Sequence, residues 1–300
     1  MRRLLLLFAP MLLANGALTS DPPEIPAPIR AMLDAAIASG NEGDVATVVK
    51  LARSADPASG DAVAAVAATW LATRAKERDS TIRQAGAFDL WRGRAELGGY
   101  MSTGNTDTSG ATAVIDLTRE GLNWRHKLRA QGDYQRNAGI TNREYLLVAY
   151  EPNLKVDDRR YVYGAAQFET DRFFGYTQRY SASAGAGYSA IKSPAVTLNL
   201  ELGPAYRYTH FTDDNVESSL AARGSVDFDW KLSPGLTLRQ DASAYVQRFN
   251  STISSTSALA ARVIGPLSAQ FSYTVQYESE PPIGRVSTDT VSRASLVYTF

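Results

Sequence analysis

The sequence predicts an all-β protein: a transmembrane antiparallel β-barrel of about 12 strands, preceded by a small α-helical segment. Three observations predict this class. Beyond residue 88, apolar residues recur at every second position, which is the period of a strand. The alternating segments are long, whereas soluble strands cluster near about five or six residues. Their polar faces carry many full charges, which a barrel lumen accommodates while the apolar face meets lipid. A soluble β-sandwich is the alternative.

The first twenty residues, "MRRLLLLFAPMLLANGALTS", have the layout of a secretory signal. Arg2 and Arg3 come first, an apolar stretch runs from Leu4 to Leu13, and small residues follow. We therefore predict a signal peptide over residues 1–20 and a mature protein that leaves the cytoplasm. A buried N-terminal helix is the competing interpretation.

Residues 21–88 form the predicted periplasmic helical segment. In "PIRAMLDAAIASG" the apolar residues from Ile29 to Ile37 recur at helical spacing and make one face. A second helix is predicted from Glu42 to Arg53, and a third after Gly60. A region this small is near the lower limit for an independent core. It is expected to serve as an adaptor, or to bind a periplasmic partner.

Residues 89–300 form the predicted outer-membrane β-barrel. The segment "LSAQFSYTVQYE" at 267–278 alternates without a break between apolar and polar residues. Because this half shows no helical pattern, an antiparallel meander is the simplest topology. The predicted strands are 91–103, 108–119, 122–135, 142–152, 160–171, 178–190, 195–210, 216–231, 235–248, 254–264, 266–278 and 287–300.

The turns between these strands predict which end of the barrel faces the periplasm. An even number of strands puts both ends of the barrel chain on that side, where short turns such as "KSPA" and "IGP" would lie. Longer loops such as "NAGITN" and "FTDDNVE" would face outward, and "NLKVDDRR" is an unexpectedly long periplasmic turn. Aromatic residues near strand ends, among them Tyr161 and Tyr176, are expected in interfacial girdles.

The chain ends "SLVYTF", with Leu296, Tyr298 and Phe300 at alternate positions. This ending resembles the signal by which the barrel assembly machinery takes up outer-membrane barrels. The stretches "ELGGYMSTGNTDTSGATAVIDLTRE", "NWRHKLRAQGDY" and "FETDRFFGYTQRYSASAGAGY" resemble the domain of unknown function family 481. Its members are often called YdiY-like or salt-induced outer-membrane proteins. The resemblance covers roughly residues 90–300. It implies a barrel in the bacterial cell outer membrane and transfers no catalytic residue.

Charged residues on the polar strand faces are the candidate site. They could pair across strands and brace a filled barrel. Alternatively, they could line a narrow aqueous path, in which the arginines would make a constriction that favours anions. The candidate lumen or constriction residues are Arg94, Glu96, Arg125, Arg129, Glu169, Arg207, Arg223, Asp227, Arg239 and Asp241.

Two patterns suggest chemistry that the rest of the sequence does not favour. His210 lies near Ser218 and Ser219, and a His–Ser pair near the outer rim is used by the outer-membrane phospholipase. The stretch from Asn105 to Asp116 matches part of a calcium-loop pattern, but it joins two alternating strands where such loops join helices. We expect a surface hairpin there, and no metal or other cofactor.

The sequence therefore predicts an outer-membrane barrel of structural or small-solute pore type, without chemistry of its own. A lipid-modifying enzyme, or an envelope adhesion or stress protein, is the alternative. The expected partners are outer-membrane lipid and, during biogenesis, the barrel assembly machinery. The formal charge of zero gives no reason to expect nucleic acid, and the absence of cysteine excludes disulfides and thiolate sites.

Overall fold

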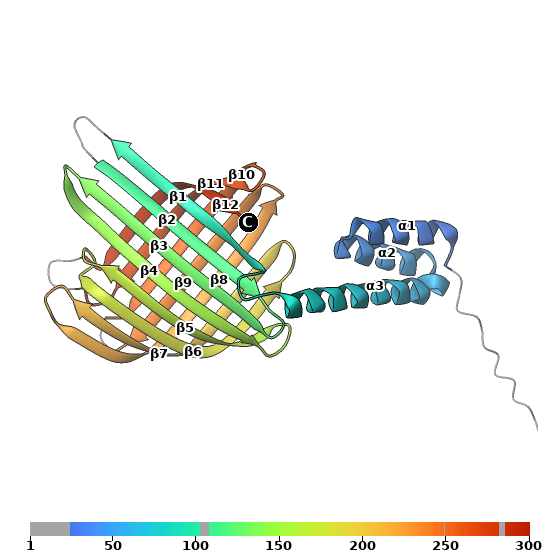
Figure 1. Cartoon of the computed structure of the whole chain (residues 1–300), viewed down its shortest axis with the longest axis horizontal. Coiled ribbons are helices and arrows are strands. Elements are labelled where there is room, and N and C mark those ends of the chain that lie inside the picture. The colour runs from blue at the N-terminus through green and yellow to red at the C-terminus, as the bar shows by residue number, and fades with distance from the viewer. Residues whose placement is uncertain (1–24, 103–107, 249, 282–285) are drawn as a thin grey trace, which may run out of the picture. The chain divides into compact units, whose positions relative to one another are not determined.

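A computed structural model of the chain describes residues 25–102, 108–248, 250–281 and 286–300. The predicted signal peptide and the centre of the "GNTDT" hairpin lie outside these described residues. The chain divides into two compact units, one up to Gln84 and one from Ala85 to Phe300. Each unit is described by itself (Figure 1).

The first unit packs three helices around a small apolar core. Leu33, Val45 and Val63 are at most 1% exposed and come from the three helices in turn. The last helix begins at Pro57, earlier than predicted, because a proline at a helix start loses no hydrogen bond. Within the described chain, none of these helices is long and apolar enough to cross a membrane. The helices are α1 (Ala27–Ser39), α2 (Glu42–Ala55) and α3 (Pro57–Gln84).

The second unit is a closed antiparallel barrel, which confirms the predicted class (Figure 1). Each strand pairs with its neighbours in sequence, and the last strand pairs with the first, so that no edge is left open. The strands are β1 (Trp91–Ser102), β2 (Thr108–Glu120), β3 (Trp124–Asn137), β4 (Ile140–Lys155), β5 (Arg160–Asp171), β6 (Tyr176–Lys192), β7 (Val196–Phe211), β8 (Val216–Ser233), β9 (Leu236–Gln247), β10 (Thr252–Ile264), β11 (Leu267–Glu278) and β12 (Thr288–Thr299).

The strands separate apolar and polar side chains onto the two faces of the barrel wall. Leu97 and Leu220 point outward and are 68% and 78% exposed. Their neighbours on the other face, such as Glu96 and Ser219, point into the barrel. An exposed apolar surface around a polar interior is the arrangement of barrels that span lipid.

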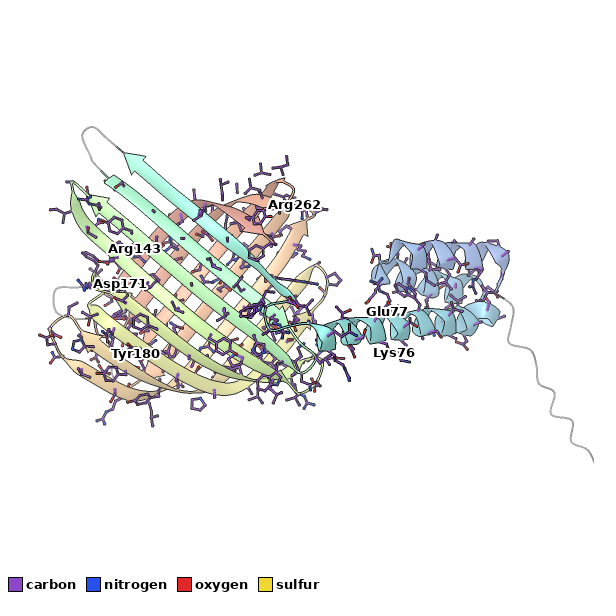
Figure 2. All side chains as sticks on the ribbon, viewed as in Figure 1. Lys76, Glu77, Arg143, Asp171, Tyr180 and Arg262 are labelled. Atoms are coloured by element: carbon purple, nitrogen blue, oxygen red, sulfur yellow. The ribbon has the colours of Figure 1, made fainter. Side chains whose placement is uncertain are left out.

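The barrel has two ends, which we name by their contents. The terminal end holds the start of β1 and Phe300. The loop end holds the opposite turns, including the one between β5 and β6. Figure 2 shows Arg143 and Asp171 toward the loop end and Arg262 toward the terminal end.

Two predicted loops are wrong because the strands beside them are longer than expected. The "NAGITN" segment is mostly strand, and only Ala138 and Gly139 form its turn, with φ of 49° and 77°. Two successive residues with positive φ are typical of tight hairpin turns. The strand β4 was predicted to end at Pro152, which cannot donate a ladder hydrogen bond. Pairing with β5 pauses at Pro152 and then resumes in the same register.

As a consequence, the β4–β5 turn spans only residues 156–159. Asp157 orders this turn, because its carboxylate accepts hydrogen bonds from the backbone N–H groups of Arg159 and Arg160 at 2.9 and 2.7 Å. These bonds stabilise the charged carboxylate and lower the pKa of Asp157 to about 2. The predicted long turn "NLKVDDRR" is therefore wrong, because Asn153, Leu154 and Lys155 belong to β4 and Arg160 belongs to β5.

The expected position of two aromatic residues is also wrong. Tyr161 and Tyr176 are 5% and 2% exposed and point into the barrel, not toward an interfacial girdle. The hydroxyl of Tyr161 donates to Glu201 at 3.1 Å. Other strand-end aromatics, such as Trp124 and Tyr298, do point outward. Nearness to a strand end does not determine the face on which a side chain lies.

Strands β6 and β7 approach each other unusually closely at Gly203. A Cβ atom there would lie 2.1 Å from the carbonyl oxygen of Ala184, so Gly203→Ala must push the two strands apart. We expect the free energy of unfolding to fall by about 1–3 kcal/mol. Urea titration of the barrel in detergent micelles measures this change. Gly224→Ala is the matched control, because the nearest atoms to its Cβ would be 3.9 Å away. Equal stability of the two variants would contradict the close approach.

Candidate functional site

A cavity of about 1150 Å³ occupies the barrel lumen. It extends from turn residues at the terminal end, such as Pro234 and Pro266, to Phe174 and Gln276 near the loop end. We call it the lumen cavity. Because inward side chains from every strand line it, its properties follow from the charges that these side chains carry.

Basic side chains outnumber acidic ones in this lining. Among the described residues that line the cavity, twelve are basic and eight are acidic. The basic residues are Arg92, Arg94, Lys127, Arg129, Arg143, Arg179, Arg207, Arg223, Lys231, Arg239, Arg262 and Arg293. The acidic residues are Glu96, Asp116, Glu151, Glu169, Glu201, Asp227, Asp229 and Asp241.

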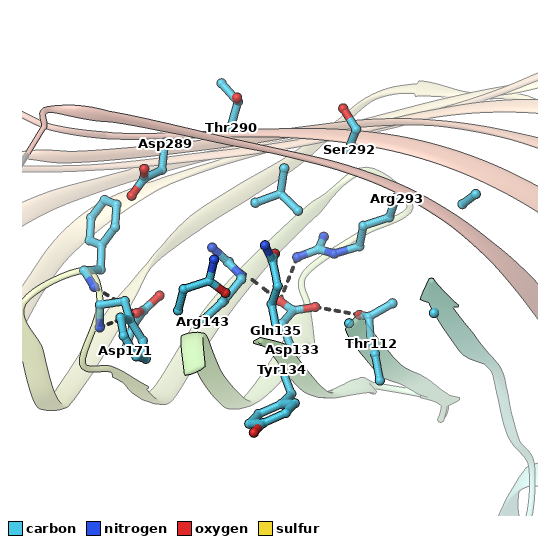
Figure 3. A pocket seen from close by; sticks show the side chains of 18 residues that line it. Thr112, Asp133, Tyr134, Gln135, Arg143, Asp171, Asp289, Thr290, Ser292 and Arg293 are labelled. Atoms are coloured by element: carbon cyan, nitrogen blue, oxygen red, sulfur yellow. Dashed lines mark hydrogen bonds and ion pairs between the residues drawn. The ribbon is translucent and has the colours of Figure 1, made fainter. Parts of the chain in front are cut away.

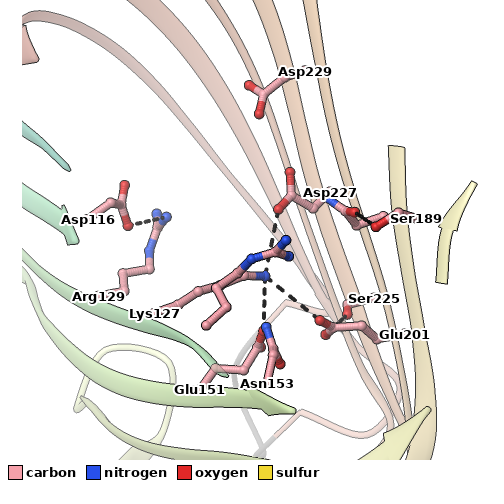
Figure 4. A network of polar contacts seen from close by, with 12 residues as sticks. Asp116, Lys127, Arg129, Glu151, Asn153, Ser189, Glu201, Ser225, Asp227 and Asp229 are labelled. Atoms are coloured by element: carbon pink, nitrogen blue, oxygen red, sulfur yellow. Dashed lines mark hydrogen bonds and ion pairs between the residues drawn. The ribbon is translucent and has the colours of Figure 1, made fainter. Parts of the chain in front are cut away.

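Lys127 crosses the lumen in the terminal half of the barrel (Figure 4). From β3 its ammonium group lies 3.0 Å from Glu151 on the adjacent strand β4. It also lies 3.8 Å from Glu201 on β7 and 3.9 Å from Asp227 on β8. Strands β3 and β8 are not neighbours in the closed sheet, so these ion pairs span the interior. Arg223 on β8 completes the network, 3.0 Å from Glu201 and 3.5 Å from Glu151.

A second network lies along the inner wall around Asp116. Arg94 on β1 and Arg129 on β3 approach its carboxylate from both sides, at 2.8 and 3.1 Å. Arg94 also donates to Gln270 at 3.4 Å, and Gln270 in turn donates to Glu96 at 2.9 Å. The network therefore joins four strands of the wall, from β3 through β2 and β1 to β11.

A third interaction crosses the lumen toward the loop end. Arg179 on β6 and Glu278 on β11 form an ion pair at 2.8 Å, with side chains 3% and 0% exposed. The second carboxylate oxygen of Glu278 accepts a hydrogen bond from Asn250 at 2.8 Å. The guanidinium of Arg179 lies over the ring of Tyr176, 3.7 Å from its centroid. This pair is sealed from water more completely than the Lys127 network.

Arg207 is a buried guanidinium with no carboxylate within ion-pair distance among the described residues. It donates to the hydroxyls of Ser181 at 3.2 Å and Thr252 at 2.8 Å. It also stacks over Tyr245, 4.0 Å from the ring centroid. Its charge therefore contributes to the positive excess of the lumen cavity, and the acidic side chain of Glu169 acts on it only from beyond ion-pair distance.

The structure places the sequence-predicted residues on the inward face, and nine of the ten line the lumen cavity. Arg125 does not line it, because its guanidinium is held by Glu120 at 2.5 Å near the terminal end. Glu169 accepts a hydrogen bond from Tyr145 at 3.2 Å, and Arg239 pairs with Asp229 at 2.6 Å.

Sequence reasoning left Lys127, Arg179 and Glu278 out of the candidate set. Strand alternation contained a signal for Lys127, which shares a face with Arg125 and Arg129. Nothing in the strand period indicated the partners across the lumen, because the period assigns faces and not distances between remote strands.

A separate pocket of about 600 Å³ lies at the loop end (Figure 3). We call it the loop-end pocket. Three residues, Arg143, Phe174 and Arg293, line both this pocket and the lumen cavity, and so form a shared wall. The carboxylate of Asp133 forms ion pairs with both arginines of this wall, at 2.7 Å to Arg293 and 3.7 Å to Arg143.

Comparison with known proteins identifies the family. Residues 95–300 match the family described as "Protein of unknown function, DUF481". The chain belongs to this family. It is similar to "Uncharacterized protein YdiY" of Escherichia coli (strain K12), with 26% identity over 198 residues, which cover 66% of this chain and 78% of the relative.

Two solved structures are similar to this DUF481 chain in fold. The NanC porin has a TM-score of 0.45 at 12% identity, covering 69% of this chain and 99% of the porin. An outer-membrane channel from Pseudomonas putida F1 has a TM-score of 0.43 at 7% identity, covering 72% of this chain and 100% of the channel.

The remaining sequence hypotheses concern particular side chains of this DUF481 chain. His210 is hydrogen-bonded through Nδ1 to the hydroxyl of Thr177 at 2.8 Å. Ser219 points inward while His210 and Ser218 point outward, and no hydrogen bond of the described residues joins His210 to either serine. These described residues do not form a Ser–His pair. Asp116, the last position of the calcium pattern, is bound by arginines in the lumen. No group of three or more potential metal-binding His, Cys, Asp or Glu side chains occurs in the described part of the chain.

The C-terminal residues have the alternation that the sequence indicated. Leu296, Tyr298 and Phe300 are 53%, 50% and 52% exposed on the outward face. Val297, between them, is buried inside the barrel. The three side chains named as a barrel-insertion signal thus form one continuous outward row at the end of the chain.

Proposed function

We propose that this protein is an outer-membrane pore for small solutes and that it prefers anions. The observation that supports this proposal is the charge of the lumen cavity, where the twelve basic side chains still outnumber the acidic ones when Glu278 and Asp133, the partners of Arg179 and Arg293, are counted with the lining. Rings of Arg and Lys side chains favour anions in pores. The loop end would face the outside of the cell, and the apolar outer face would contact outer-membrane lipid.

Single-channel recording on the refolded full chain in planar bilayers tests this proposal. A potassium chloride gradient across the bilayer should give a reversal potential of the sign that chloride permeation produces. Arg207→Gln should reduce this anion preference, because Arg207 lines the lumen cavity and no carboxylate of the described residues holds it in an ion pair. Arg125→Gln is the matched control, since Arg125 pairs with Glu120 and does not line the lumen cavity.

A reversal potential of the cation-selective sign would overturn the anion preference. The absence of discrete conductance steps from a barrel with normal heat-dependent gel mobility would overturn the pore itself. That second outcome would favour a structural barrel, the alternative supported by the ion pairs that cross the lumen.

The same proposal assigns roles to the chain's two ends. The outward row of Leu296, Tyr298 and Phe300 would be recognised by the barrel assembly machinery during insertion. The helical unit would lie in the periplasm and serve as an adaptor for a partner there, after removal of a signal peptide over residues 1–20.

A further inference from the structure

The loop-end pocket has the size and lining of a site for a small molecule. Its volume of about 600 Å³ falls within the usual range for ligand sites, roughly 300–1000 Å³. Phe173 and Phe174 supply apolar surface, and Asp171 holds both in place by accepting their backbone N–H groups at 3.0 and 2.9 Å. The pocket therefore combines ordered aromatic side chains with charged ones (Figure 3).

One wall of the pocket carries excess positive charge. Arg143 and Arg293 share the single carboxylate of Asp133, which also accepts hydrogen bonds from Thr112 at 2.6 Å and Gln131 at 2.9 Å. Arg293 takes the close position, and Arg143 lies at 3.7 Å, beyond hydrogen-bond distance.

Arg143 has one buried donor without a partner among the described residues. Its side chain is only 15% exposed, yet its buried Nε atom has no hydrogen-bond partner among the described residues. Its other contact is with the ring of Tyr145, 5.7 Å from the centroid. A buried guanidinium donor without a partner costs free energy unless a ligand or water satisfies it.

The other wall of the pocket carries negative charge. Asp289 on β12 points inward and makes no hydrogen bond or ion pair with any residue that the structure describes. Asp171 uses one carboxylate oxygen for the turn, and its second oxygen has no hydrogen-bond partner in the same part of the chain. Figure 3 shows Asp289 and Asp171 on one side of the pocket and Arg143 beside them. None of the ion pairs of the described residues joins Arg143 to either carboxylate.

We propose that the loop-end pocket binds a small zwitterionic solute, an amino acid or short peptide. The solute's carboxylate would lie on Arg143, its ammonium group on Asp289 and Asp171, and its apolar part against Phe173 and Phe174. A simple anion would face the two carboxylates, and a simple cation would face Arg143, whereas a zwitterion matches both walls. The site does not depend on conduction through the lumen.

Ligand-observed NMR titration of the full chain in detergent micelles tests the proposal. The probes are L-phenylalanine and glycyl-L-phenylalanine, whose charges are farther apart, with 3-phenylpropionate and phenethylamine as analogues that lack one charge. We expect at least one zwitterion to bind, and both analogues to bind at least tenfold more weakly. Micelles without protein provide the correction for partition into detergent.

Variants connect the binding to the pocket. Arg143→Gln and Asp289→Asn should each weaken zwitterion binding at least tenfold. Arg136→Gln should leave it unchanged, because Arg136 is an exposed loop-end arginine bonded to the backbone of Gly139 and does not line the pocket. Heat-dependent gel mobility checks that each variant remains a folded barrel.

The proposal is overturned if neither zwitterion binds the folded protein, or if a singly charged analogue binds as tightly. It is also overturned if both pocket variants, folded, bind as the unmodified chain does. A folded barrel that binds the zwitterion but never conducts would overturn the pore and leave this site intact.

Discussion

Replacing Glu278 by alanine is expected to lower the free energy of unfolding of the barrel by about 3–5 kcal/mol. The substitution leaves the guanidinium of Arg179 buried at 3% exposure without its carboxylate partner. It also removes the acceptor of the Asn250 side chain. Urea titration in detergent micelles measures the change in the free energy of unfolding. The folded fraction at each urea concentration is read from the heat-dependent gel mobility of the folded form.

Two further variants separate this effect from a general loss of charge. Glu120→Ala removes a carboxylate that is 50% exposed, and should cost only about 1 kcal/mol or less. The double variant Arg179→Met/Glu278→Leu removes both buried charges and should recover most of the lost stability. If Glu278→Ala unfolds at the same urea concentration as the unmodified chain, the cross-lumen pair contributes nothing to the fold.

Replacing Lys127 by methionine is expected to open the path through the terminal half of the lumen, because ion pairs no longer hold the side chain across it, and to reduce the anion preference. The change removes the ammonium group that lies between Glu151, Glu201 and Asp227, and leaves Arg223 as the remaining basic partner of the two glutamates. The three carboxylates then repel one another and attract cations. Single-channel recording should show a larger conductance and a reversal potential shifted toward cation permeation.

Lys155→Met is the control for this second prediction. Lys155 is also an inward-facing lysine at the terminal end, but it binds Glu120 at 2.6 Å and the carbonyl oxygen of Gly121 at 2.8 Å, and it does not line the lumen cavity. Its conductance and selectivity should match those of the unmodified chain. Unchanged conductance in Lys127→Met would show that the crossing side chain does not limit the path.

Most of the barrel could be predicted from the sequence because each strand carries its own period. Alternation assigned faces correctly for segments such as 267–278, which the structure shows as β11 (Leu267–Glu278). The predicted strand boundaries were wrong where a residue that usually ends a strand lies inside one. Pro152 suggested a boundary, yet the neighbouring hydrogen bonds on both sides hold β4 in place across the interruption.

The candidate site could be predicted only in part, for a physical reason. Alternation identifies which charges face inward, and it found Arg129 and Arg207 in this way. Whether an inward charge pairs along the wall or across the lumen depends on the closure of the barrel and on which remote strands face each other. The pair of Arg179 and Glu278, separated by 99 positions, follows from closure and not from any local pattern.

The loop-end pocket could not be predicted from the sequence, because it depends on how two arginines share the carboxylate of Asp133. Arg143, Arg293 and Asp133 are ordinary inward charges in the sequence. Only their distances reveal that Arg293 occupies the acceptor and leaves Arg143 without one. Phe174 likewise looked like a loop residue, although the turn places it 8% exposed in the interior.

Because Arg143, Phe174 and Arg293 line both cavities, we expect an occupant of one cavity to change the affinity of the other for its own occupant. A guanidinium that is engaged by an occupant on one side is less available to a solute on the other. Linkage then requires mutual antagonism of equal size: whatever factor one occupant imposes on the affinity of the second, the second imposes on the first. In the proposed pore, a solute bound in the lumen cavity would therefore weaken binding in the loop-end pocket, and the reverse.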